Sequence, residues 1–156
     1  MKNLITLLIC TFFFISCGNS NQGNQNNAEN IIKVKTIIGK TEKEIEKILG
    51  KPDSSEKVSP SNTPCKDEPC TKMFYQKNKF EIVYINGKSD WITINNISDF
   101  DCNSENIVLL GLPPTIPDFE NLNGFRWSNI ENISEINFSN NGEDKIDYIY
   151  IKSTTK

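Results

Sequence analysis

The chain has 156 residues, of which 37% are hydrophobic and 24% are charged, and its formal net charge is -3. This charge, together with basic residues that are all lysine except Arg126, argues against a surface that binds nucleic acid. The chain contains no histidine. Ser-His, Cys-His and histidine-metal chemistry are therefore excluded.

The N-terminal segment has the order of residues that is typical of an export signal. Lys2 precedes an apolar run from Leu4 to Ile15, and small and amide side chains follow Cys17. The run is shorter than the ~20 residues that a membrane-spanning helix needs. The stretch "FISCG" around Cys17 resembles the lipobox of bacterial lipoproteins. The resemblance implies cleavage before Cys17 and lipid chains such as palmitate on that residue; an ordinary signal peptide with a chance cysteine is the alternative.

Composition divides the chain into three parts. We predict a signal peptide at 1–16, a lipid anchor with a disordered tether at 17–30, and one folded domain at 31–156, because the Gly, Asn, Ser and Gln side chains of the tether cannot bury apolar surface. The tether lacks acidic residues directly after Cys17, unlike the surface-export signals of Bacteroidota lipoproteins. We therefore expect a protein of the cell envelope, anchored by lipid to the outer membrane and facing the periplasm.

A first helix is predicted in "TEKEIEKILGKPD". Thr41 and Glu44 form a capping box, and Gly50 with Pro52 ends the helix. The apolar residues at helical spacing are Ile45, Ile48 and Leu49.

A second, shorter helix is predicted in "NSENIVLLGLPP". Ser104 is its expected N-cap, Ile107 and Leu110 lie on one side, and Gly111 and Pro113 end it.

A strand-rich stretch follows each helix, and each contains an Asn-Gly pair, at Asn86-Gly87 and Asn141-Gly142, that is typical of a hairpin turn. The predicted strands lie at 72–76, 79–86, 90–95, 124–128, 133–139 and 145–152. We expect an α+β fold in two layers, made of two tandem units, 37–98 and 99–152, each with a short helix and an antiparallel three-stranded meander.

This pattern resembles the SmpA/OmlA (BamE) type of envelope lipoprotein and the related β-lactamase-inhibitor-protein-like fold. The resemblance rests on "EIEKILGKPD" with "MFYQ", and on "IVLLGLPP" with "FRW". It implies a binding or scaffolding module without catalysis.

Three cysteines remain outside the expected signal and lipid site. Cys65 and Cys70 flank "KDEP" in a loop rich in Pro and Ser, and we predict a disulfide between them because an exported loop gains stability from closure. A bond from Cys102 to one of them is the alternative, and zinc held by the three thiols is a more distant one.

Two carboxylate pairs are the remaining candidates for catalysis or for binding Ca²⁺. They are Asp99 with Asp101 and Asp118 with Glu120. Both pairs lie in segments rich in Pro, Asn and Gly, where solvated acids are the ordinary finding. We therefore expect no enzyme activity, no cofactor and no metal.

Side-chain alternation defines a candidate binding face. Trp91, Thr93, Tyr148 and Tyr150 lie on the faces opposite Ile92, Ile94, Ile149 and Ile151. If the isoleucines face the helices, the aromatic residues form an open protein-binding face. The alternative, which the abundance of aromatic residues in protein interiors favours, is that these rings pack in a core shared by the two units.

The expected function is a non-catalytic protein-binding module. The partner would be another envelope protein, with the chain acting as a scaffold or assembly accessory for outer-membrane proteins. An inhibitor-like binder of a secreted or periplasmic hydrolase, with the Cys65–Cys70 loop entering a cleft, is the second hypothesis.

Overall fold

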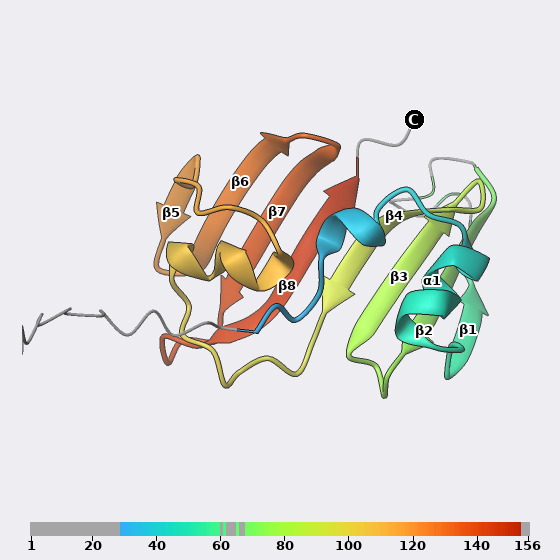
Figure 1. Ribbon diagram of the computed structural model, residues 1–156, viewed down its shortest axis with the longest axis horizontal. Helices are drawn as coiled ribbons and strands as arrows, with labels where there is room; N and C mark the ends of the chain where they lie inside the picture. Colours follow the sequence, from blue (N-terminus) through green and yellow to red (C-terminus); the bar gives the residue numbers. More distant parts are fainter. Residues whose placement is uncertain (1–28, 60, 62–64, 66–67, 154–156) are drawn as a thin grey trace, which may run out of the picture.

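The computed structural model describes residues 29–59, 61, 65 and 68–153, so the expected signal peptide, the lipid site at Cys17 and most of the expected tether lie outside the described residues. Eight strands form one antiparallel sheet in the order β1-β2-β3-β4-β8-β7-β6-β5 (Figure 1). The strands are β1 (Ser54–Lys57), β2 (Cys70–Tyr75), β3 (Phe80–Ile85), β4 (Lys88–Ile94), β5 (Phe119–Asn121), β6 (Gly124–Ile130), β7 (Ile133–Asn140) and β8 (Ile146–Ser153).

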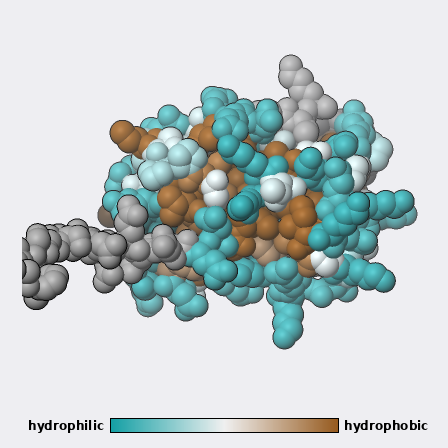
Figure 2. Space-filling model, in the orientation of Figure 1, coloured by the Kyte–Doolittle hydropathy of each residue, from teal (hydrophilic) through white to brown (hydrophobic). Residues whose placement is uncertain are grey.

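Three helical segments lie side by side on one face of this sheet (Figure 1). They are the 3-10 segments η1 (Val34–Thr36) and η2 (Ser104–Leu110) and the α-helix α1 (Glu42–Leu49). Their buried residues share one apolar core with the inward-facing sheet residues, which include Ile82, Ile92, Ile94, Trp127, Ile136, Phe138, Ile149 and Ile151. Figure 2 shows apolar residues in the middle of this face, with hydrophilic residues around them.

The prediction of an α+β fold made of two tandem helix-plus-three-strand units is wrong. The protein is mainly β, and a single continuous sheet replaces the separate units because β4 pairs with β8. Ile92 lies opposite Ile151, and Ile94 lies opposite Ile149, all fully buried. This pairing covers two strand edges that separate units would leave open, which is the physical reason for one sheet.

All six predicted strands are present, with ends that differ from the prediction by at most two residues. The sequence did not indicate β1 and β5. Both are short, and all their residues are exposed, so neither carries the alternation of apolar and polar residues that marks a strand.

The first helix begins and ends as predicted. The backbone N–H and the hydroxyl of Thr41 donate to the Glu44 carboxylate at 2.8 and 2.7 Å, and these hydrogen bonds hold the Glu44 pKa below its usual range. Gly50 follows the last turn with a φ of 87°. Ile48, however, is 43% exposed, so the buried side of α1 is narrower than predicted.

The second helix is a 3-10 segment rather than an α-helix, and its cap lies one residue earlier than predicted. The Asn103 side chain, not that of Ser104, accepts a hydrogen bond from the Asn106 backbone at 3.1 Å. Gly111 has the left-handed conformation that the stop signal requires.

The two Asn-Gly pairs differ in outcome. Asn86 and Gly87 have φ values of 51° and 73° and form the predicted two-residue hairpin between β3 and β4. The second pair instead lies in the longer connection from 141 to 145, where Gly142 and Asp144 have positive φ.

The segment before α1 connects the two halves of the sheet on the helical face. Its first residues, Ile31 and Ile32, donate to the Leu109 carbonyl at 2.8 and 3.3 Å. At its other end the Lys40 N–H donates to the Ser89 hydroxyl at 3.0 Å. In the part of the chain that the structure describes, no helix has the length and apolar character needed to span a membrane.

Candidate protein-binding face

The sheet face opposite the helices carries the four residues that the sequence singled out. We call this the open face. Thr93 pairs with Tyr150 and Trp91 pairs with Lys152, so these residues point to the same side. Trp91, Thr93, Tyr148 and Tyr150 are all absent from the core on the helical side. The structure therefore places them on the open face and not in an interior shared by two units.

Strand register arranges the open face in two rows that cross the sheet. One row is Ser54, Phe74, Glu81, Thr93, Tyr150, Asn137, Arg126 and Phe119. The other is Glu56, Lys72, Val83, Trp91, Lys152, Glu135 and Ser128. Aromatic, charged and polar side chains are thus mixed on this face over both halves of the protein.

Trp91 and Tyr150 form the centre of this face. Their rings meet edge to face with centroids 5.2 Å apart, and the Lys152 ammonium lies 5.3 Å from the Trp91 centroid. Such contacts each stabilise by about 0.5–1.5 kcal/mol and fix the ring positions. Burial raises the pKa of the Tyr150 phenol, and the charges of Glu135 and Asp90 raise it further, so the hydroxyl stays neutral at physiological pH.

The disulfide predicted between Cys65 and Cys70 is present, and it supports Trp91. The two Cα atoms are 5.6 Å apart. Both cysteines are buried with Val83 in a second, smaller core, against which Trp91 packs. The disulfide therefore lies against the open face of the sheet and supports the Trp91 side chain from one side.

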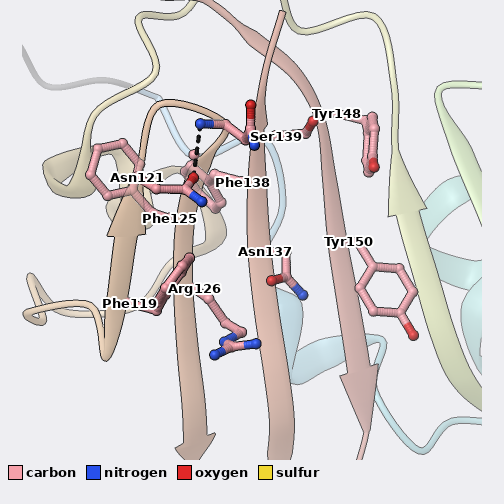
Figure 3. A pocket seen from close by; sticks show the side chains of 11 residues that line it. Phe119, Asn121, Phe125, Arg126, Asn137, Phe138, Ser139, Tyr148 and Tyr150 are labelled. Carbon is pink, nitrogen blue, oxygen red and sulfur yellow. Dashed lines mark hydrogen bonds between the residues drawn. The ribbon is translucent and has the colours of Figure 1, made fainter.

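A depression of about 400 Å³ opens at the β5–β8 end of the open face (Figure 3). Tyr148 and Tyr150 line it, as do residues that the sequence reading did not select, chiefly Phe119, Arg126 and Asn137. The Arg126 guanidinium carbon lies 5.0 Å from the centroid of the Phe119 ring. The signal that could have pointed here is that Arg126 is the one arginine of the chain, within the aromatic "FRW".

Exposed apolar side chains gather at the same end of the sheet. Ile116 is 89% exposed, Leu122 92% and Phe119 47%, and all three lie within seven residues of chain around β5. Tyr148, at 40%, lies in the wall of the depression. Three exposed apolar side chains within one short segment favour an interaction site at this end of the sheet.

The two carboxylate pairs do not converge. All four side chains are exposed: Asp101 pairs with Lys145 at 2.6 Å, and Asp118 accepts from the Ser128 backbone at 2.6 Å. Among the residues that the structure covers, no group of three or more His, Cys, Asp or Glu side chains could hold a metal ion.

Cys102 is a free thiol that packs half-buried against the main core, and it is not joined to either disulfide cysteine. Burial raises its pKa, and the charge of Asp144 raises it further. The thiol is therefore less reactive than an ordinary exposed cysteine.

Comparison with known proteins gives no relative: no family model, no curated protein and no solved structure matches the chain.

Proposed function

We propose that the protein is a lipid-anchored, non-catalytic module of the cell envelope that binds another envelope protein through its open face. It serves as a scaffold or assembly accessory at the outer membrane, on the periplasmic side. The observation that carries the proposal is the pair of Trp91 and Tyr150, held by Lys152 and the disulfide on a face that no helix covers. Fixed aromatic side chains of this kind dominate the energetics of protein interfaces.

Charge on the open face supports a protein partner. The three cation–aromatic contacts among the described residues all lie there: Lys72 with Phe74, Lys152 with Trp91, and Arg126 with Phe119. Lys72 also pairs with Glu81 at 2.9 Å. Paired charges around aromatic residues keep the free protein soluble. The same surface can lose its bound water when it packs against a complementary protein.

The lipid anchor rests on the sequence around Cys17 and can be tested separately. Cells grown with an alkyne-bearing palmitate should label the full-length protein and retain it in the membrane fraction. Cys17→Ser should abolish the label and release the protein, whereas Cys10→Ser should change neither. Label that persists in Cys17→Ser would contradict the anchor.

The partner is tested by crosslinking the native lipoprotein in cells and identifying the captured protein by mass spectrometry. We expect capture of an outer-membrane protein or its assembly machinery, and loss of capture in Trp91→Ala/Tyr148→Ala/Tyr150→Ala. Tyr148→Ala alone should weaken capture without affecting the fold, because this ring is exposed. Ile48→Ala is the matched control, since it removes an exposed apolar side chain from the opposite face.

Other outcomes decide against the scaffold. Capture of a soluble hydrolase would favour the inhibitor-like binder. Capture that is indifferent to the aromatic substitutions, or no capture at all, would overturn the open face as the binding site.

A further inference from the structure

Arg126 forms no ion pair with a carboxylate among the described residues, unlike four of the lysines. Lys35, Lys40, Lys72 and Lys145 each pair with a carboxylate, but within the described part of the chain the Arg126 guanidinium has no carboxylate partner and donates no hydrogen bond. Its contact is with the Phe119 ring, whose centroid lies 5.0 Å from the guanidinium carbon. Because no hydrogen bond or ion pair among the described residues uses them, the five N–H donors of the guanidinium remain available to a planar oxyanion.

The walls around Arg126 define what else a ligand must contain. Phe119 lies on one side of the guanidinium and Asn137 on the other, with the ring of Tyr150 beyond (Figure 3). The Asn137 amide donates to the Glu135 carboxylate at 2.6 Å. This nearby carboxylate is therefore bonded to Asn137 and not to Arg126. A single charged donor set therefore lies between the Phe119 ring on one side and the Asn137 amide and Tyr150 ring on the other. This arrangement suits a carboxylate flanked by apolar groups.

The edge strand next to the depression suits an extended chain. β5 (Phe119–Asn121) is the last strand of the sheet, and none of the described elements pairs with its outer side. The exposed side chains of Ile116 and Leu122 flank it. A strand added at this edge would cover both and would direct every second side chain towards the depression.

We propose that the depression binds an extended segment of the partner protein, with a glutamate or aspartate side chain on Arg126 and apolar neighbours against Phe119 and Tyr148. The inference rests on the proposed function and names the chemistry of the partner. An anionic lipid surface fits less well, because such surfaces are recognised by clusters of several Lys and Arg residues. Arg126 is the one cation among the residues that line the depression.

The test uses two synthetic peptides, acetyl-Phe-Glu-Leu-amide and acetyl-Phe-Gln-Leu-amide, titrated into the full chain with its disulfide intact. Because the chain has one arginine, its side-chain Nε–H gives a single signal in a ¹⁵N NMR spectrum. We expect the glutamyl peptide to shift this signal in a saturable way and to bind about tenfold more tightly than the glutaminyl peptide, since a bidentate ion pair replaces a neutral contact.

Variants separate the carboxylate contact from general adhesion. Arg126→Gln should abolish the difference between the two peptides, as read from the backbone amides of β5 and β6. Lys47→Gln, which removes an exposed charge on the helical face, should preserve it. Equal affinity of the two peptides, or no saturable shift with either, would overturn the inference. So would binding of Arg126 to phosphatidylglycerol vesicles without binding to the glutamyl peptide.

The crosslinking experiment keeps this failure distinct from failure of the proposed function. A partner that is captured by Arg126→Gln as well as by the native chain, but is lost in the triple aromatic variant, would remove the carboxylate contact and leave the open face as the binding site. A partner lost in both, with the peptide preference intact, supports both. If the peptides show the preference but no partner is captured, the proposed function is wrong and the carboxylate contact still stands.

Discussion

Two tyrosines on the helical side of the sheet form a hydrogen bond inside the core. The hydroxyls of Tyr75 and Tyr84 are 2.8 Å apart, and both side chains are buried. Burial raises the pKa of both phenols above the ordinary value of 10.0. Above that pH the unfolded chain loses protons that the folded chain keeps, so the unfolded state binds fewer protons. The stability is therefore fully present below about pH 10 and falls as the pH rises further.

Substitution of this pair should change both stability and its pH dependence. Tyr84→Phe should lower the free energy of unfolding by about 1 kcal/mol, because it leaves the Tyr75 hydroxyl without its main partner. Tyr75→Phe/Tyr84→Phe should recover part of the loss at pH 8, since both partners become apolar. Urea unfolding from pH 8 to pH 11 should show a shallower decline for the double variant. An equally steep decline would contradict the assignment to these phenols.

At the same scale, the sequence could place the aromatic residues but not the centre of the depression. Alternation along single strands correctly put Trp91 and Thr93 on one side and their isoleucine neighbours on the other. Arg126 became a candidate only when register across β5, β6 and β7 brought it between Phe119 and Asn137. Register between distant strands is set by the whole sheet, and no local pattern encodes it.

Among the elements, local signals succeeded where a backbone conformation demanded particular residues. The capping box of α1 and the Asn86-Gly87 turn both follow this rule. β1 and β5 escaped prediction because tertiary pairing, not their own composition, makes them strands.

Gly124, at the start of β6, lies where the backbones of β6 and β7 approach closely. It has a φ of 133°, and a Cβ there would lie 1.8 Å from the Phe138 carbonyl oxygen. Gly124→Ala should therefore destabilise by about 3 kcal/mol through displacement of β7. Gly142→Ala is the matched control, because Gly142 also has a positive φ but has open space around it, and it should cost only about 1 kcal/mol. Thermal unfolding measures both. Equal losses would mean that φ alone accounts for the effect.

For the whole molecule, the pairing of β4 with β8 decides cooperativity. Each half of the sheet contains one tryptophan, Trp91 on β4 and Trp127 on β6. The shared core predicts that both halves unfold in a single transition. The prediction of two tandem units was wrong because no local pattern in β4 or β8 indicates that these strands pair. They lie about 60 residues apart in the sequence.

The two tryptophans provide the measurement. In Trp91→Phe, the fluorescence of Trp127 should change at the same urea concentration as the far-ultraviolet circular dichroism of the whole chain. In Trp127→Phe, the fluorescence of Trp91 should likewise coincide with the dichroism. Comparison within each variant removes the effect of the substitution on stability. Separate midpoints in either variant would show that the halves unfold independently.

The hydrogen bonds that tie Ile31 and Ile32 to Leu109 also determine how the protein responds to mechanical load. A pull along the chain before Ile31 reaches these bonds first and opens them one after another, whereas the strands of the sheet lie further along the chain. Release of residues 31–36 would add roughly 20 Å of reach before the hydrogen bonds to Ser89 of β4 are loaded. An optical-trap recording should show this early extension, and the open face should keep its shape while the chain before Ile31 is pulled away.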